Sequence, residues 1–525
     1  MTPQNLRVIG LGGLLDDAAC ALAADGKIVA AVEQKKIARR HYPGSLPQEA
    51  IDATLAIGKL SPAQIDAVAI ARPLSTSPES ILSLRVKQIF PNARLLILDH
   101  QTAHAASAYY ASGFTDSTVL TLDRAGDLRC AARWRASAGR LELEQESYFP
   151  DSLGDLYGRV TEFLGFASRA DEHKVQWLSA SGDARFTDLF ESILGFRAQG
   201  WPSLNRAYFD RDRIGGGGFS TDFYKALGLA DGEAPPALLK PDIAAGLQRA
   251  IENCAITMAG TSENICLAGG VAFNALLVRA FEASGRFQNV YVQPAAGNSG
   301  TAIGAAYSAS TSPRVALSSL ALGPSYNAEE IKQVLENCKL SPKFLLTTDE
   351  LIQSALKELS EHRILAWFQD RMEFGPRALG NRSILASPLD PYATENLNSF
   401  IKHREAFRKF AASVPAEFAG QYFESSANAR NLASVATVLP QHRERFAPAL
   451  LGTDGIRLHV VHKEENPLFH RLLVAAGSST GLPVLYNTSF NLFGDALVCS
   501  PRDAVRSFYS SGIDVLFVGN FLLRK

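Results

Sequence analysis

Met372-Glu-Phe-Gly-Pro-Arg-Ala-Leu-Gly-Asn-Arg-Ser-Ile384 is the stretch that decides how the last third of this chain folds. It follows the apolar run 364–368, which has the pattern of a buried strand. Glycines break regular structure on either side of Arg377, and Arg382 follows. Guanidinium groups bind carboxylate or phosphate through paired hydrogen bonds, so the stretch predicts a turn that holds an oxyanion. The alternative is a turn whose arginines form exposed ion pairs.

A second basic stretch, Phe400-Ile-Lys-His-Arg-Glu-Ala-Phe-Arg-Lys-Phe410, favours the first interpretation. Its cations Lys402, Arg404 and Arg408 lie among aromatic residues, so part of the segment must be buried. Buried cations need anionic partners, and Glu405 alone cannot neutralise three of them. We therefore expect a phosphate-like ligand.

Composition restricts the partners that the chain can have. At 525 residues it is too long for one hydrophobic core, so two or more domains are expected. A hydrophobic fraction of 46% and a charged fraction of 20% are typical of globular proteins. The formal net charge of −1 argues against binding to nucleic acid or to a membrane surface. The basic stretches are therefore expected to serve a small anion.

Cysteine usage and the chain's start indicate the compartment. The six cysteines include no CxxC pair, which argues against a zinc ribbon or a disulfide framework and favours a reducing cytoplasm. Residues 1–5 lack the basic-then-apolar pattern of a signal peptide, and no apolar run reaches membrane-spanning length. We expect a cytoplasmic protein.

The first part of the chain alternates strands and helices, as α/β proteins do. Apolar strands are predicted at 6–9, 18–22, 27–32, 67–71 and 95–99, with a helix near 47–58. Asp25-Gly26 is a strong hairpin signal. A strand, a turn with Asp16 and Asp17, and then a hairpin is how actin-like ATPase domains begin, although many α/β proteins start in the same way.

His100 and His104 follow the strand at 95–99 and open a helix. A spacing of four residues places both imidazoles on one helical face, close enough to share a metal ion. A pair of structural histidines is the alternative. Small residues around the pair and its position at the end of a strand favour a ligand site.

Two further strand ends carry groups suited to phosphates. A glycine pair after the strand at 264–267 allows backbone N–H groups to approach a phosphate at the start of a helix. An apolar strand at 484–491 ends in three polar residues, which more often line a cleft than fill a core. The groups at these two ends are Gly269, Gly270 and Asn274, and Asn487, Thr488 and Ser489.

Taken together, these segments resemble the O-carbamoyltransferase family of the nodulation and antibiotic-tailoring type. The resemblance is carried, in family order, by HQTAHAASAYY (100–110), EHKVQWLSASG (172–182), LAGGVAFN (267–274), GTAIGAA (300–306), RMEFGPRALGNRSIL (371–385), IKHREAFRKFAASV (401–414) and YNTSFNLFGD (486–495). It implies an α/β fold in which an actin-like ATPase (Kae1-like) carbamoyl-transfer domain over 1–345 precedes a YrdC-like domain over 346–525 that forms carbamoyl adenylate.

The resemblance also implies substrates and site residues. Carbamoyl phosphate and ATP with Mg would react in the second domain, and the carbamoyl group would pass to a hydroxyl of a sugar or another small molecule. A homodimer is compatible with it. Carbamoyl phosphate and ATP would be bound by Arg377, Arg382, Lys402, Arg404, Arg408, Arg457, Asn487, Thr488, Ser489, Gly269, Gly270 and Asn274. Catalysis would involve His100, His104, Asp123 and Lys174, with iron at His100, His104 and Asn298.

Three departures from the family pattern bear on activity. Asn298 stands where the family has a metal-binding Asp, and an amide is a weaker ligand than a carboxylate. Arg124 replaces a glycine, and the segment 451–459 lacks one residue before Arg457. These departures leave open a binding protein without turnover as the alternative. The near-neutral charge argues against a relative that modifies tRNA.

Overall fold

The computed structural model of the chain describes residues 6–40, 42–73, 79–196, 200–213, 215–492 and 494–525. The expectation about a signal peptide concerns residues 1–5, which lie outside the described residues. The chain separates into two compact units, one made of Met1–Leu98 with Asn298–Lys525 and the other of Asp99–Gly297. Each unit is described by itself below.

The first unit begins with a five-stranded sheet of order β3-β2-β1-β4-β5. Its strands are β1 (Arg7–Gly12), β2 (Ala19–Ala24), β3 (Lys27–Glu33), β4 (Ala67–Ala71) and β5 (Arg94–Leu98), with α1 (Gln34–Ala38), α2 (Gln48–Gly58) and α3 (Glu79–Ile89). Strands β1 to β3 are antiparallel, whereas β4 and β5 continue from β1 in parallel. Helix α11 (Thr301–Ala309) packs against β1, because Gly10 has no side chain: a Cβ there would lie 2.0 Å from the carbonyl oxygen of Ala302.

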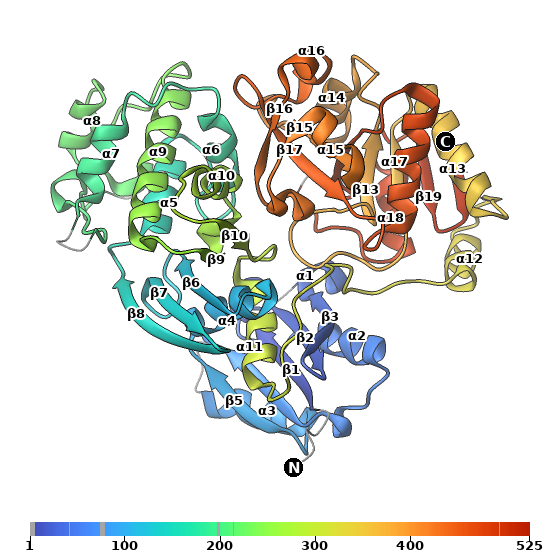
Figure 1. The fold of residues 1–525 in the computed structure, drawn as a ribbon, viewed down its shortest axis with the longest axis horizontal. Coiled ribbons are helices and arrows are strands. Elements are labelled where there is room, and N and C mark those ends of the chain that lie inside the picture. The colour runs from blue at the N-terminus through green and yellow to red at the C-terminus, as the bar shows by residue number, and fades with distance from the viewer. Residues whose placement is uncertain (1–5, 41, 74–78, 197–199, 214, 493) are drawn as a thin grey trace. The chain divides into compact units, whose positions relative to one another are not determined.

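The second unit repeats this sheet. Its order is β10-β9-β6-β7-β8, with β6 to β8 antiparallel and β9 and β10 continuing from β6 in parallel. Helices α5, α6, α7 and α9 are grouped together in this unit (Figure 1). The elements are α4 (His100–Ser112), β6 (Asp116–Leu122), β7 (Arg129–Ser137), β8 (Arg140–Tyr148), α5 (Leu153–Phe163), α6 (Glu172–Ser179), α7 (Thr187–Leu194), α8 (Thr221–Ala226), α9 (Lys240–Ala259), β9 (Asn264–Ala268), α10 (Ala275–Ala283) and β10 (Asn289–Val292). Two sheets with one strand order and one pattern of directions confirm the predicted actin-like α/β architecture.

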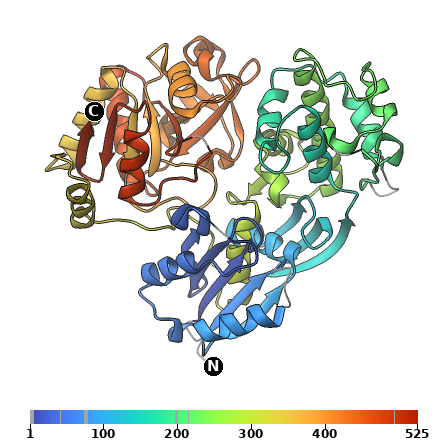
Figure 2. The ribbon, with the colours of Figure 1, turned by 180° about the vertical axis from the view of Figure 1, so that it is seen from behind.

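The rest of the first unit is built on a ten-stranded mixed sheet, with helices along it (Figure 2). Its strands, in sheet order, are β11 (Lys343–Phe344), β20 (Phe521–Arg524), β19 (Val515–Val518), β12 (Leu365–Phe368), β13 (Arg382–Ala386), β18 (Leu485–Ser489), β14 (Ala411–Pro415), β17 (Gly455–Val461), β16 (Val435–Val438) and β15 (Phe423–Glu424). Apolar residues of α13 (Thr348–Ser360) and α17 (Pro467–Thr480) form a core on one face. Those of α12 (Ala328–Asn337), α15 (Ala416–Tyr422) and α18 (Pro501–Tyr509) form the core on the other face. This sheet confirms a second α/β region.

The predicted boundary at residue 345 falls just after β11 and stays a prediction. Strand β11 pairs with β20, and Ile331 and Leu335 of α12 are buried in the core of the ten-stranded sheet. The packing of the C-terminal region therefore already includes residues upstream of 345.

Short elements complete the described chain. They are η1 (Pro62–Gln64), η2 (Arg206–Tyr208), η3 (Gly216–Gly218), η4 (Gly270–Phe273), η5 (Asn298–Gly300), α14 (Ala393–Asn396), η6 (Leu397–Lys402), η7 (Ala427–Asn431), η8 (Pro440–His442), α16 (Arg443–Phe446) and η9 (Ala447–Ala449). In the part of the chain that the structure describes, no helix combines the length and the apolar character that crossing a membrane requires.

Candidate functional site

The turn between β12 and β13 is closed by a carboxylate. Glu373 is 1% exposed, and its Oε1 accepts hydrogen bonds from the backbone N–H groups of Leu379 at 2.8 Å, Asn381 at 2.9 Å and Arg382 at 3.2 Å. Such a set of N–H groups around one carboxylate fixes the path of the chain. The turn therefore presents Arg377, which lies between these contacts, from a defined backbone.

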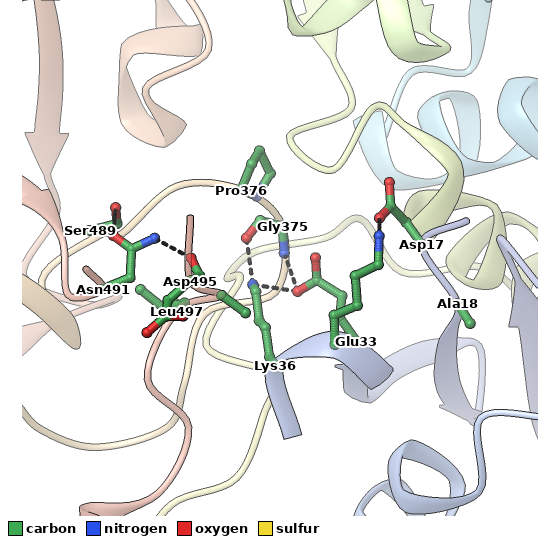
Figure 3. A pocket seen from close by; sticks show the side chains of 12 residues that line it. Asp17, Ala18, Glu33, Lys36, Gly375, Pro376, Ser489, Asn491, Asp495 and Leu497 are labelled. Atoms are coloured by element: carbon green, nitrogen blue, oxygen red, sulfur yellow. Dashed lines mark hydrogen bonds and ion pairs between the residues drawn. The ribbon is translucent and has the colours of Figure 1, made fainter. Parts of the chain in front are cut away.

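Lys36 and Glu33 hold the same turn from the other side (Figure 3). The Nζ of Lys36 donates to the carbonyl oxygens of Glu373 at 3.0 Å and Gly375 at 2.5 Å, and it forms an ion pair with Glu33. Glu33 accepts from the N–H of Gly375 at 3.1 Å. Lys36 is 6% exposed, so these contacts are shielded from water. The corner between β3 and α1 thus fixes the backbone that carries Arg377.

A cavity of about 210 Å³ lies beside this contact. Its lining combines acidic, basic and amide groups from the first sheet, the turn and the loop after β18 (Figure 3). Ser489 and Asn491 contribute to the wall, so the cavity borders one of the predicted strand ends.

Arg382 is buried by neutral partners. It is the first residue of β13, it is fully buried, and its guanidinium lies 3.6 Å from the centroid of the Phe368 ring. It donates to the carbonyl oxygens of Gln369, Asn381, Pro324 and Asp370. These contacts give Arg382 a structural environment that no other predicted arginine shares among the described residues.

Four other predicted arginines form a cluster. They are Arg377, Arg404, Arg408 and Arg457, and we call them the guanidinium cluster. Burial, together with the positive charges of Arg377, Arg404 and Arg408, lowers the pKa of Arg457 well below its usual value. Burial also lowers the pKa of Arg377 to about 10. Burial and the charge of Arg408, opposed by Glu405, lower the pKa of Arg404 to about 9.

The contacts of Arg404 and Arg408 include one carboxylate, one amide oxygen and one aromatic ring. Arg408 lies 3.6 Å from Glu405, and Arg404 donates from Nε to the amide oxygen of Asn398 at 2.8 Å while its guanidinium covers the Phe410 ring at 4.2 Å. The Nη2 of Arg404 is buried and has no hydrogen-bond partner among the described residues. Cations gathered at this density require an anion to compensate them. The cluster is therefore a candidate site for an anion, and its role stays a prediction.

Lys402 lies next to the cluster but is differently occupied. Its Nζ is held by the carbonyl oxygens of Ser489 at 2.5 Å and Asn491 at 2.9 Å and by the side-chain oxygen of Asn491 at 2.7 Å. Burial and the charges of Arg404 and Arg408 lower its pKa well below the usual value. Lys402 thus fixes the loop after β18.

The polar end of β18 reaches the same face of the sheet as Arg457. Asn487 pairs with Ala411 of β14, and Ala411 pairs with Arg457 of β17, so the three residues form one row. Ser413 lies two residues further along β14, opposite His459. Its Oγ is 3.2 Å from Nδ1 of His459 and accepts from Asn487 at 3.1 Å. Burial, followed by the charge of His462, lowers the pKa of His459 to about 3. Thr488 and Ser489 are partly buried at the strand end.

The second unit contains a group that can bind a metal ion. Nε2 of His100 lies 2.6 Å from Oδ2 of Asp123 and 3.1 Å from Nε2 of His104, and the latter lies 3.6 Å from Asp123. One ligand atom from each residue lies within 4.8 Å of the others. The histidines come from the first turn of α4, and Asp123 directly follows β6. The predicted histidine pair is thus joined by a carboxylate.

The surroundings keep this group in place. Burial raises the pKa of Asp123, but hydrogen bonds from His100 and His104 outweigh this effect and lower the pKa well below its usual value. Asp123 is therefore a carboxylate. Gly126 packs on the His100 ring so closely that a Cβ would lie 2.2 Å from Cδ2. A Cβ on Gly270 would lie 3.3 Å from Oδ1 of Asp123. The glycine pair predicted to bind phosphate therefore lies directly beside the metal-ligating group.

The remaining predicted residues have separate environments. Lys174 forms an ion pair with Asp171 at 3.3 Å. Arg124 donates to Asp155 of α5 and to Ser168, each at 3.1 Å. Their proposed roles stay predictions.

Three more of the predicted site residues are Asn274, Gly269 and Asn298. Asn274 is the N-cap of α10, where its side chain accepts from the N–H of Leu277 at 3.0 Å. Gly269 has a φ of 92° and approaches β6 so closely that a Cβ would lie 2.1 Å from the carbonyl oxygen of Leu122. Asn298 begins η5 in the first unit, and its role as a metal ligand stays a prediction.

The sequence motifs do not indicate Lys36, Glu33 or Glu373. Lys36 and Glu33 form an ion pair at a spacing of three residues, which is a local signal, but their contacts with the turn are to backbone atoms. Glu373 also contacts backbone atoms, and such contacts leave no spacing signal in a sequence. The catalytic role of Asp123 stays a prediction, and its place beside two histidines adds the capacity to bind a metal.

The chain belongs to the carbamoyltransferase family. Residues 79–307 match the family model described as the carbamoyltransferase N-terminus, and residues 356–525 match the model of the carbamoyltransferase C-terminus. The protein is therefore a transferase by family, as the motifs predicted.

The chain is also similar to individual proteins, one of which is named as an O-carbamoyltransferase. Nodulation protein NolNO of Sinorhizobium fredii is 30% identical over 97% of this chain and 79% of its own length. Protein sll1178 of Synechocystis sp. is 32% identical over 99% of this chain and 96% of its own length. The 3'-hydroxymethylcephem-O-carbamoyltransferase of Streptomyces clavuligerus is 30% identical over 49% of this chain and 48% of its own length. Among solved structures, component A of the Acidaminococcus fermentans (R)-2-hydroxyglutaryl-CoA dehydratase covers 58% of this chain and 97% of its own, with 15% identity and a TM-score of 0.37.

Proposed function

We propose that the protein is an O-carbamoyltransferase that uses carbamoyl phosphate and ATP and passes the carbamoyl group to a hydroxyl of a small molecule. The observation that carries the proposal is the guanidinium cluster, in which Arg377, Arg404 and Arg408 lie near enough to Arg457 to lower its pKa. The name of one relative, 3'-hydroxymethylcephem-O-carbamoyltransferase, describes O-carbamoylation of a cephem, which is a small molecule.

The cluster suits the activation of carbamoyl phosphate. In the proposed step, water and carbamoyl phosphate give carbamate and phosphate, and the carbamate oxygen then attacks the α-phosphorus of ATP, so that pyrophosphate leaves and carbamoyl adenylate forms. Both leaving groups are multiply charged, and preorganised guanidinium groups stabilise the charge that develops on them. Each desolvated contact of this kind contributes on the order of 1.5–3 kcal/mol. Mg²⁺ would accompany ATP.

The second unit would carry out transfer to the acceptor. His100, His104 and Asp123 offer two imidazole nitrogens and one carboxylate oxygen, a donor set that suits iron, zinc or manganese. A metal ion held there would act as a Lewis acid toward an acceptor oxygen or a carbonyl oxygen. The carboxylate of Asp123 is ionised and lies beside His100, so it can also hold or orient a proton of the acceptor hydroxyl.

The first test is pyrophosphate release from carbamoyl phosphate and ATP without an added acceptor. Release is expected, and omission of carbamoyl phosphate should abolish it. A folded protein that binds ATP and yet releases no pyrophosphate contradicts the proposal and favours the binding-protein alternative. Mass spectrometry of small hydroxyl compounds that gain a carbamoyl group then identifies the acceptor class.

A further inference from the structure

The side-chain amide of Asn487 is oriented by fixed partners. Its Nδ2 donates to the carbonyl oxygen of Ala378 at 3.2 Å and to Oγ of Ser413 at 3.1 Å. A carbonyl oxygen can only accept, so the contact with Ala378 determines which amide atom is the nitrogen. Asn487 is 2% exposed. Its Oδ1 therefore has one direction, away from both partners.

That oxygen has no hydrogen-bond partner among the residues that the structure describes. A buried amide oxygen without a donor costs about 1–3 kcal/mol, so such atoms are rare unless a ligand satisfies them. In this protein the unsatisfied oxygen occurs where donors are abundant, in the same sheet row as Arg457. We therefore expect a ligand to donate a hydrogen bond to Oδ1 of Asn487.

The row leaves space for a small group. Asn487 and Arg457 are separated by one strand, which places their backbones about 10 Å apart. The residue between them is Ala411, whose methyl group fills little of the space above the sheet. One end of the row carries a cation of the guanidinium cluster, and the other end carries a neutral acceptor. A ligand that fits has an anionic oxygen at one end and an N–H donor at the other.

We propose that Asn487 recognises the amide nitrogen of the carbamoyl group, and that it distinguishes carbamoyl phosphate from acyl phosphates that have no N–H. This inference rests on the proposed function, because it takes carbamoyl phosphate as the substrate. In carbamoyl phosphate the NH₂ group is attached to the carbonyl carbon that bears the bridging oxygen of the anhydride to phosphate, so its N–H donor and its anionic oxygens are only a few bonds apart. The adenine amino group of ATP is separated from its phosphates by the ribose and fits the row poorly.

Acetyl phosphate is the matched probe. It has a methyl group in place of NH₂ and is otherwise similar in size and charge, so it would leave Oδ1 of Asn487 unsatisfied. Sites built to hydrogen-bond a substrate N–H strongly reject analogues that lack it. Calorimetric binding to the wild-type protein should therefore favour carbamoyl phosphate over acetyl phosphate by on the order of tenfold. Equal affinities for the two compounds in the wild type would overturn the inference without any substitution.

Asn487→Ala tests the residue itself. The variant should bind carbamoyl phosphate on the order of tenfold more weakly, while its affinity for acetyl phosphate and for inorganic phosphate stays within about twofold of the wild type. Ser413→Ala is the matched control, because it keeps Oδ1 and should retain the preference for carbamoyl phosphate. An equal loss of all three anions, or a loss of ATP affinity instead, contradicts the assignment.

The two proposals fail differently in these measurements. Selective binding of carbamoyl phosphate without pyrophosphate release would contradict the proposed reaction and support the role of Asn487. Pyrophosphate release that is equally fast with acetyl phosphate would support activation chemistry and contradict the role of Asn487. Absence of carbamoyl phosphate binding in the wild type overturns both.

Discussion

Arg382 and Arg457 are guanidinium groups in one ten-stranded sheet, and their charged surroundings differ. Arg382 is surrounded by backbone carbonyl oxygens and an aromatic ring. Arg457 donates to the carbonyl oxygen of Lys409 at 3.4 Å, and three other guanidinium groups lie near enough to lower its pKa. Burial lowers the pKa of both groups. Burial alone therefore does not separate a structural cation from a ligand-binding one, whereas the nature of the neighbours does.

Lys36 and Lys402 extend this comparison. Both ammonium groups are buried and both donate to backbone carbonyl oxygens, so both belong with Arg382 as cations that fix the chain. What they fix are the turn that carries Arg377 and the loop that follows Asn487. Structural cations thus shape the site in which the guanidinium cluster would bind its anion.

The largest effect is expected when the structural arginine is removed. Arg382→Met removes the guanidinium that donates to the carbonyl oxygens of Gln369 and Asp370 and the cation next to the buried Glu373, so the free energy of unfolding should fall by about 3–5 kcal/mol. Chemical denaturation monitored by tryptophan fluorescence measures the change. A loss below about 1 kcal/mol would break the distinction between the two kinds of arginine.

Arg457→Met should show the opposite pattern. Removing one member of a mutually repelling cluster should leave the free energy of unfolding unchanged or raise it, whereas the rate of pyrophosphate release should fall by about 10- to 100-fold, because a desolvated contact to a phosphate is lost. Arg471→Met removes an exposed arginine that pairs with Asp349, and it should change neither quantity. A destabilised Arg457→Met protein with full activity would assign Arg457 to the structural class.

A smaller effect is expected when the hydrogen bonds between Lys36 of α1 and the turn are removed. Lys36→Met should raise the KM for carbamoyl phosphate by about three- to tenfold and leave kcat less changed, because the turn that carries Arg377 loses its outer support. Lys36→Arg should restore part of the affinity. The neighbouring Lys35 forms an exposed ion pair with Asp17, so Lys35→Met is a matched control that should behave like the wild type. Similar KM values for Lys36→Met and Lys35→Met would remove Lys36 from the positioning residues.

The smallest effect concerns His100, His104 and Asp123, the group that can bind a metal ion. Asn298→Ala is expected to leave the metal content of the purified protein unchanged, whereas Asp123→Asn and His104→Ala should lower it. Elemental analysis of the metal-reconstituted variants checks this. A loss of metal in Asn298→Ala alone would make the amide, rather than Asp123, the third ligand.

The sequence predicted the regular elements well where patterns are local. The strand at 67–71 coincides with β4, and the hairpin signal at Asp25-Gly26 joins β2 and β3. The helix that contains both histidines begins at His100, because Asp99 caps it by accepting from the N–H of Thr102. Hydrophobic runs, turn residues and caps act over a few residues, so one sequence is enough to recognise them.

The basic stretches predict one anion site, and the structure separates their arginines into two environments. Arg377, Arg404, Arg408 and Arg457 form the guanidinium cluster, whose role in anion binding stays a prediction. Arg382 follows Arg377 by only a few residues, yet it is the first residue of a buried strand and is directed to other partners. Which side of a turn an arginine takes depends on tertiary contacts such as those of Glu373, and no local pattern contains that information.

Gly126 shows how a site can be lost without any change in its chemical groups. Its lack of a side chain allows the imidazole of His100 to come this close to the loop. An alanine there would meet the ring at 2.2 Å and would have to displace it from Asp123. A relative could thus retain every donor atom and still have no competent metal centre, so an inventory of ligands is an incomplete guide to which members of such a family are active.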